Sequence, residues 1–186
     1  MDSFIFEKRN VLGVEDCQII RRYFEKHPFE HLPGTFGSDV VDTSRKDSTD
    51  IPMNFLKKNE VNSLIHSGLK IVCNEYKKIY PILDKLSRWE VNSEYNLQRY
   101  YPNQGYHVLH CENAGRDSKL ERVLAWMIYL NDIEDGGGTS FPQYNRIIKS
   151  EEGKCVIWPA YWTHMHKGIV SKTQTKYIAT GWFIWV

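Results

Sequence analysis

The residues best suited to bind a metal ion lie in the segment GYHVLHCEN, residues 105–113. His110 and Glu112 are two positions apart, so on an extended strand their side chains leave the same face, while Leu109 and Cys111 leave the other. Such a pair can hold one metal ion. With seven histidines and 23 acidic residues in 186, however, about one such pair is expected by chance. A third ligand is therefore needed before the pair indicates a metal site.

The third ligand must come from WPAYWTHMHKG, residues 158–168, which contains the only histidines downstream of Glu112, namely His164 and His166. Two histidines and one carboxylate form the set that binds one face of a non-haem Fe(II) ion and leaves three positions open. Zinc can use the same ligands. A structural zinc site would instead have four ligands, usually with thiolates, and the required spacing is not offered by the four cysteines, Cys17, Cys73, Cys111 and Cys155.

A basic residue that follows the histidines suggests a bound anion. Lys176 lies ten positions after His166 and begins KYIATGWFIWV, residues 176–186, which is predicted to be a strand. A cation buried in a barrel is costly unless it meets an anion. A dicarboxylate cosubstrate would supply that anion, so the combination favours an iron site with a cosubstrate over an isolated metal-binding pair.

Two amphipathic helices are predicted in the N-terminal half of the chain. The first covers residues 14–27, with acidic residues in its first turn and Pro28 after its end. The second covers residues 55–79, ends before Pro81 and is expected to bend or break near Gly68. Both helices have an apolar face that must pack on another element.

The segment between the helices, residues 31–52, is rich in Gly, Ser, Thr and Asp and is predicted to be mostly loop, with a short strand at Val40 and Val41. It is either a solvated connection or a lid over a site, because long loops in compact domains are often functional. Arg45 in this segment could reach a substrate, although a solvated arginine is the more common role.

After Leu86 the chain consists of short segments rich in Tyr, Trp, Val and Ile, separated by turn signals such as YPNQG and DGGG. This pattern predicts a run of strands. The expected fold class is α+β and mainly β, with two N-terminal helices packed on a β-sandwich or barrel. We expect one domain over residues 1–186, in which residues 1–86 form the helical support and lid loop and residues 87–186 form the barrel core.

Composition excludes some classes of partner. The chain has 24 Lys and Arg against 23 Asp and Glu, a net charge of +1 and no basic run that would follow phosphates, so no nucleic-acid partner is expected. No apolar stretch reaches the length of a membrane span and no targeting segment is visible, which predicts a cytoplasmic protein without membrane contact. The widely spaced cysteines predict free thiols, and the oligomeric state cannot be read from these patterns.

Several motifs occur in a fixed order from about Leu97 to the C-terminus. They are RYYPNQGY before the first ligand, HCE at 110–112, YLND and GGGTSFP after it, and EEGKCVIWP before the distal histidine. In these motifs the chain resembles the Fe(II)- and 2-oxoglutarate-dependent dioxygenases, in particular their prolyl 4-hydroxylase-like branch. The resemblance implies a double-stranded β-helix, which is a jelly-roll of the cupin-like kind, with helices that buttress one face.

The resemblance also implies roles for individual residues. It assigns iron to His110, Glu112 and His166, and prefers His166 over His164 because the family's basic residue lies ten positions after the ligand. Lys176 would pair with the distal carboxylate of 2-oxoglutarate. The other implied contacts are with the cosubstrate for Tyr101, Tyr129 and Thr180, and with the substrate pocket for Trp182. Arg45 and His164 are further candidates for contact with the substrate.

The chain departs from the usual pattern of the branch at two points. Glu112 stands where Asp is usual, and its extra methylene moves the carboxylate. The spacing from Gly105-Tyr106 to the ligand is one residue longer than in some relatives, which affects the position expected for Tyr101. His107, three residues before the ligand, is expected to face away from the metal.

The function implied is hydroxylation of a C–H bond, with decarboxylation of 2-oxoglutarate to succinate, and the first candidate substrate is a prolyl residue in a peptide or protein. Fe(II), 2-oxoglutarate and O2 are the expected cofactor and cosubstrates, with ascorbate as a possible reductant. Two alternatives stay open: the same chemistry on a small molecule or free amino acid, and a jelly-roll binding module without catalysis.

Overall fold

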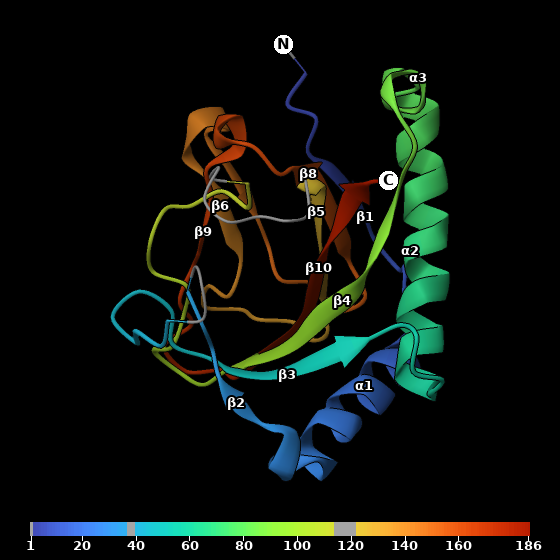
Figure 1. The fold of residues 1–186 in the computed structure, drawn as a ribbon. Helices are drawn as coiled ribbons and strands as arrows, with labels where there is room; N and C mark the ends of the chain where they lie inside the picture. The colour runs from blue at the N-terminus through green and yellow to red at the C-terminus, as the bar shows by residue number, and fades with distance from the viewer. Residues whose placement is uncertain (1, 37–39, 114–121) are drawn as a thin grey trace.

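The computed structural model describes residues 2–36, 40–113 and 122–186, and its strands form two antiparallel sheets (Figure 1). Within these residues the larger sheet has the order β1-β8-β5-β10-β4-β3-β2 and the smaller sheet the order β7-β6-β9. The strands are β1 (Phe6–Lys8), β2 (Leu32–Pro33), β3 (Thr49–Asn54), β4 (Trp89–Tyr100), β5 (Arg122–Tyr129), β6 (Thr139–Phe141), β7 (Arg146–Ile148), β8 (Cys155–Pro159), β9 (Lys167–Gly168) and β10 (Lys176–Trp185).

Alternation along the central strands separates two cores. On β10, Ile178 packs between the two sheets, whereas Ala179 and Phe183 pack toward the helices. On β5, Tyr129 likewise faces the smaller sheet and Trp126 faces the helices. Both faces of the large sheet are therefore covered, which gives the mainly β jelly-roll with helical support that the sequence predicts.

The helices cover one face of the large sheet (Figure 1). They are α1 (Val14–Lys26), α2 (Glu60–Ile79) and the short α3 (Ile82–Leu86), with single 3-10 turns at Pro28–Glu30, Pro142–Tyr144 and Trp162–His164. The helix α1 ends before Pro28, as expected. At its start the carboxylate of Asp16 accepts a hydrogen bond from the backbone N–H of Gly13 at 2.9 Å, which satisfies one free donor of the first turn.

The second helix differs from its prediction at two places. It begins at Glu60 and not at residue 55, because the side chain of Asn59 caps it by accepting a hydrogen bond from the backbone N–H of Asn62 at 2.7 Å. The helix also runs without a break through Gly68. That glycine is needed for packing, since a Cβ there would lie 2.9 Å from Cγ1 of Val11.

The segment 31–52 contains more regular structure than predicted. Strand β3 pairs along its whole length with β4, from Thr49 opposite Arg99 to Asn54 opposite Glu94. Val40 forms only an isolated bridge with Phe36, and residues 37–39 lie outside the described residues. The remaining loop lies beside the segment that contains the first predicted ligand, because Lys46 forms a β-bridge with Tyr106.

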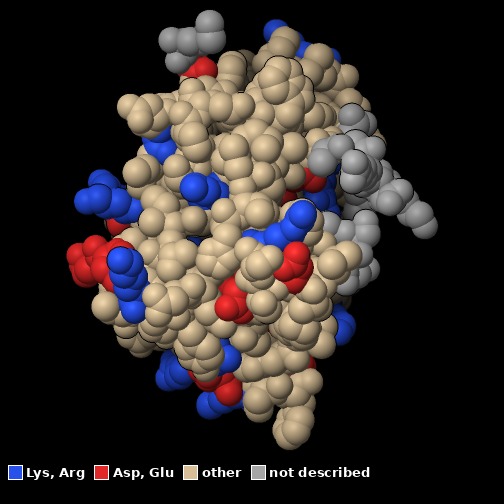
Figure 2. Space-filling model, turned by 90° about the vertical axis from the view of Figure 1, so that its left-hand side faces the viewer, with Lys and Arg blue, Asp and Glu red and all other residues tan. Residues whose placement is uncertain are grey.

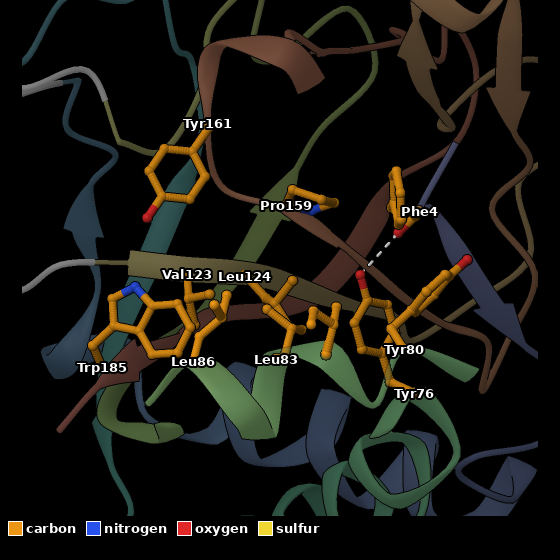
Figure 3. Close-up of a pocket in the computed structure, with 11 residues that line it drawn as sticks. Phe4, Tyr76, Tyr80, Leu83, Leu86, Val123, Leu124, Pro159, Tyr161 and Trp185 are labelled. Atoms are coloured by element: carbon orange, nitrogen blue, oxygen red, sulfur yellow. Dashed lines mark hydrogen bonds between the residues drawn. The ribbon is translucent and has the colours of Figure 1, made fainter. Parts of the chain in front are cut away.

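A cavity of about 300 Å³ lies between the large sheet and α3 (Figure 3). Its walls are apolar and aromatic, and the hydroxyl of Tyr76 at its edge donates to the backbone carbonyl of Phe4 at 3.1 Å. None of the predicted metal ligands lines it. On the face shown in Figure 2, basic and acidic side chains are interspersed over a largely uncharged surface. Among the described residues, no helix is long and apolar enough to span a membrane.

Candidate metal centre

His110, Glu112 and His166 lie together between the two sheets. One ligand atom from each falls within 4.8 Å of the other two. Oε1 of Glu112 is 3.1 Å from Nε2 of His166 and 3.7 Å from Nε2 of His110. Residues 56 positions apart thus present two imidazoles and one carboxylate to one point, which is the arrangement that a three-ligand metal site requires.

Backbone pairing fixes the two histidines relative to each other. His110 and His166 form an isolated antiparallel bridge, in which each backbone N–H donates to the other's carbonyl, at 3.0 and 2.8 Å. The ring of Tyr106 stacks on His110 with centroids 3.7 Å apart. The ring of Trp158 packs against His166 at 4.9 Å. The segment around His110 is not a continuous strand, so the bridge and the stacked ring of Tyr106 hold His110 in place.

The hydrogen bonds of both rings leave the same nitrogen free. Nδ1 of His110 is 3.0 Å from the carbonyl of Val108, and Nδ1 of His166 is 2.9 Å from the carbonyl of His164. In a neutral imidazole, the nitrogen that donates to a carbonyl carries the proton. Nε2 of each ring is therefore the unprotonated atom, and both Nε2 atoms point toward Glu112.

The ionisation states suit metal binding at neutral pH. Burial and the nearby His166 lower the pKa of His110 to about 4, so its ring is neutral. Burial alone would raise the pKa of the Glu112 carboxyl, but its contacts with His166 and His110 and the hydrogen bond from the indole of Trp182 bring it down to about 2. The site then offers an ionised carboxylate between imidazoles, which is the protonation state that metal binding requires.

Lys176 is a buried cation in the same interior. Its side chain lies at the start of β10, is 6% exposed, and places Nζ 4.6 Å from the ring centroid of Tyr100. Burial lowers the pKa of its ammonium group to about 8. Among residues 2–36, 40–113 and 122–186, we find no carboxylate that pairs with it. A buried ammonium without a counter-ion is costly, so the structure provides a place for an anionic ligand.

Tyr101 is not brought to this interior. Its side chain is 47% exposed and lies under the guanidinium of Arg99 on the outside of β4. The preceding residue, Tyr100, faces inward instead and is buried beside Lys176. The hydroxyl of Tyr100 donates to Oε1 of Gln98 at 2.8 Å. Of the two adjacent tyrosines, the structure therefore places Tyr100 next to the cation.

The other predicted cosubstrate contacts are on inward-facing positions of the large sheet. Tyr129 is fully buried, and its hydroxyl is hydrogen-bonded to Oγ1 of Thr139 at 2.7 Å. Thr180 shares the face of β10 that carries Lys176, and its hydroxyl donates to the backbone carbonyl of Trp126 at 2.9 Å. Both hydroxyls thus have protein partners, and their contact with a cosubstrate stays a prediction.

The three predicted substrate residues differ in their contact with the cluster. Trp182 touches it directly, because its Nε1 donates to Oε2 of Glu112 at 2.8 Å. His164 is buried but turned away, with Nε2 2.7 Å from the carbonyl of Ser3. Arg45 is half-exposed and lies 3.4 Å from a carboxylate oxygen of Asp42. Of the three side chains, only that of Trp182 contacts a ligand; His164 contacts His166 through its backbone carbonyl.

His107 and Cys111 both lie outside the cluster, as the sequence predicts. His107 is exposed. The thiol of Cys111 lies 3.7 Å from the carbonyl of Asn113. The GGG segment at 136–138 is a turn before β6, with positive φ at Gly136 and Gly137. A Cβ at Gly136 would lie 2.4 Å from the carbonyl oxygen of Val170, so this position requires glycine.

Sequence reasoning missed three residues at the site, Tyr100, Tyr106 and Arg122. Arg122 donates from Nη1 to the backbone carbonyl of Glu112 at 3.0 Å, and its guanidinium lies 3.6 Å from the ring centroid of Trp182. Nothing in the local pattern of RVLAWMIY marks that arginine. The strand register could have identified Tyr100, because it pairs with Lys176 across β4 and β10.

The residues present fit a non-haem iron and a dicarboxylate. Two unprotonated Nε2 atoms and an ionised carboxylate form the donor set that suits Fe(II). The same three ligands leave other coordination positions free for small molecules. The buried ammonium of Lys176, which pairs with no carboxylate in the described part of the chain, supplies the charge that a second carboxylate would need.

Comparisons with known proteins agree with this chemistry. Residues 95–184 match the family model described as the 2OG-Fe(II) oxygenase superfamily. A protein of Acanthamoeba polyphaga mimivirus, provisionally named a prolyl 4-hydroxylase, is 22% identical over 194 residues, which cover 96% of this chain and 73% of that protein.

Solved structures show the same fold. A prolyl-4-hydroxylase of Pseudomonas putida superposes with a TM-score of 0.74 at 14% identity, over 99% of this chain and 94% of that one. A prolyl hydroxylase of Trichoplax adhaerens superposes with a TM-score of 0.72 at 14% identity, over 98% and 84%. Residues 95–184 of this chain thus match the 2OG-Fe(II) oxygenase superfamily, and prolyl 4-hydroxylases are among the proteins that the chain resembles in sequence and fold.

Proposed function

We propose that this chain hydroxylates prolyl residues in a peptide or protein, with Fe(II) as cofactor and 2-oxoglutarate and O2 as cosubstrates. The observation that carries the proposal is the pairing of a three-ligand cluster with a buried cation for which the described residues offer no counter-ion. His110, Glu112 and His166 form the cluster, and Lys176 is the cation. A metal-binding site without a cosubstrate would have no use for Lys176.

In this proposal, Nε2 of His110, Nε2 of His166 and one oxygen of Glu112 hold the iron, and the ammonium of Lys176 binds the distal carboxylate of 2-oxoglutarate. When bound, iron and 2-oxoglutarate supply the oxidising chemistry, with release of succinate and carbon dioxide and transfer of one oxygen atom to a C–H bond. The chain's own task is to bind, to orient and to keep the site dry.

Several contacts support these roles of the protein side chains. The carbonyls of Val108 and His164 hold the Nδ1 protons, so the rings stay in the tautomer that binds metal. The ring of Tyr100 lies below Lys176 and stabilises its ammonium by a cation–π contact. Because Lys176 is buried, an ion pair with the cosubstrate would be weakly screened by solvent.

A peptide is the favoured substrate because the relative in sequence and several of the relatives in fold are named as prolyl hydroxylases. The structure from Trichoplax adhaerens is a complex with a peptide fragment of a hypoxia-inducible factor. In the present chain, the loop that carries Arg45 borders the metal cluster. The backbone carbonyl of Arg45 accepts from His107 at 2.8 Å, and the backbone N–H of Asp47 donates to Gly105 at 2.9 Å. We include contact between this loop and an extended peptide in the proposal.

Succinate release from 2-oxoglutarate, measured against a panel of proline-containing peptides, tests the proposal. Each peptide is paired with a copy in which Ala replaces Pro, and free proline is a further control, with Fe(II) and ascorbate present throughout. We expect release that depends on the peptide proline. Equal release with free proline would indicate a small-molecule substrate, and the absence of 2-oxoglutarate turnover under all conditions would refute catalysis.

A further inference from the structure

The second carboxylate oxygen of Glu112 is already occupied by a protein donor. Nε1 of Trp182 donates to Oε2 at 2.8 Å, whereas Oε1 is the atom that lies near both histidine rings. A carboxylate held in this way presents one oxygen to the metal and not two. The sequence had placed Trp182 only on the wall of the substrate pocket.

Arg122 fixes the indole ring in turn. Its guanidinium carbon lies 3.6 Å from the ring centroid of Trp182, and its Nη1 donates to the main-chain carbonyl of Glu112 at 3.0 Å. Trp182 is also held by its strand, where it pairs with Ala125 of β5. The arginine and the tryptophan therefore hold both the backbone and the side chain of the ligand.

Glutamate needs such support more than aspartate does. Its side chain has one additional rotatable bond, and its final torsion has no sharp rotamer preference. Each free torsion that must be ordered weakens metal binding, and a hydrogen bond to one oxygen restricts it before the metal arrives. Residues around a ligand that hold it in this way are a general feature of metal sites.

We propose that Trp182 and Arg122 are positioning residues that make Glu112 a one-oxygen ligand and thereby allow a glutamate to serve in this site. This inference rests on the proposed iron site. It concerns the binding of the metal, so it can be tested without catalysis.

A second tryptophan provides a matched control. Trp158 also packs beside the ligands, with its ring 4.9 Å from that of His166, and it is fully buried. Its Nε1, however, is buried without a hydrogen-bond partner among the described residues. Replacement of either tryptophan by phenylalanine removes an indole N–H at the site, but only at position 182 does that N–H hold a ligand.

The test is the affinity for Co(II), measured by competition with a chromophoric chelator under anaerobic conditions. Trp182→Phe is expected to weaken binding by about 10-fold, while Trp158→Phe stays within about twofold of wild type. Thermal unfolding is measured in parallel. A loss of affinity at position 182 without a matching difference in unfolding temperature between the two variants separates positioning from general stability.

A double-mutant cycle with Glu112→Asp sharpens the test. The shorter aspartate cannot place its carboxylate at both the metal and Nε1 of Trp182, so Trp182→Phe should cost nothing further in that background. If Glu112→Asp abolishes Co(II) binding, the double-mutant cycle cannot be measured. The positioning role is then tested by the comparison of Trp182→Phe with Trp158→Phe in the wild-type background. Equal losses for the two tryptophan variants, or no loss at position 182, would overturn the inference.

A histidine variant separates the positioning role of Trp182 from the metal site itself. His166→Ala should remove Co(II) binding if the metal site is correct. If His166→Ala has no effect, the site itself is wrong. If His166→Ala removes binding and Trp182→Phe does not weaken it, the site is correct and only the positioning role fails.

Discussion

Replacement of Lys176 by methionine tests the cosubstrate site most sharply, because methionine keeps much of the side-chain volume and removes the charge. Lys176 is 6% exposed, and its ammonium pairs with no carboxylate in the described part of the chain. In the variant, the distal carboxylate of 2-oxoglutarate would be buried without a partner. Such a loss costs about 3 kcal/mol, which corresponds to a dissociation constant about 100-fold higher.

The same residue predicts a pH dependence of cosubstrate binding. Burial lowers the pKa of Lys176 to about 8 in the free protein. Below this pH the ammonium is already charged and binding takes up no proton. Above it, binding must first protonate the lysine, so the affinity for 2-oxoglutarate falls by up to about tenfold per pH unit. Lys176→Arg should remove this fall, because arginine stays protonated over the whole range.

Calorimetric titration of 2-oxoglutarate into anaerobic protein loaded with Mn(II) gives the dissociation constant without turnover. Lys154→Met is a suitable control, since Lys154 is equally buried but lies 3.1 Å from a carboxylate oxygen of Glu151. The control should leave the affinity for 2-oxoglutarate unchanged. An unchanged affinity in Lys176→Met, or a flat pH profile in the wild type, would refute the role given to Lys176.

The structure supports three further predictions. His166→Ala should abolish iron binding in an anaerobic titration. His164→Ala should largely spare it, because the ring of His164 points away from the cluster. The reverse result would make His164 the third ligand in place of His166. Lys176→Met should also raise the midpoint of thermal unfolding at pH 7 by relieving the burial of a charge. Since the folded pKa lies below the unfolded value of 10.5, this gain should shrink as the pH rises from 8 toward 10.5. Asp50→Asn should lower the free energy of unfolding by about 3 kcal/mol in urea titrations, because it leaves buried Lys46 without its partner at 2.6 Å; unchanged stability would contradict this.

The three residues of the cluster could be predicted because their types and their spacing in the sequence indicate them. Strand parity predicts that His110 and Glu112 share one side, and the structure brings them together at an isolated bridge and not on a strand. The ten-residue interval implied by the family resemblance selects His166 over His164. The same parity explains the position of Tyr101. Two tyrosines are adjacent at the end of β4, and only the strand register shows that the first of them faces inward.

Other features could not be predicted because they depend on tertiary partners. Strand β3 is TDIPMN, and its proline argues against a central strand. The structure tolerates Pro52 because β2 pairs with β3 only at Thr49 and Asp50, so the outer side of β3 is unpaired at the proline. Arg122 acts through Trp182, which is 60 residues away in the sequence. The prediction that residues 1–186 form one domain stays a prediction.

The central claim is that this site couples 2-oxoglutarate to the oxidation of a prolyl residue. The most direct measurement quantifies succinate and hydroxyproline in the same reaction, with mass spectrometry to locate the added oxygen in the peptide. We predict one hydroxylated proline for each succinate, and neither product with His166→Ala. Succinate without oxidation of the peptide, or oxidation at a residue other than proline, would contradict the account.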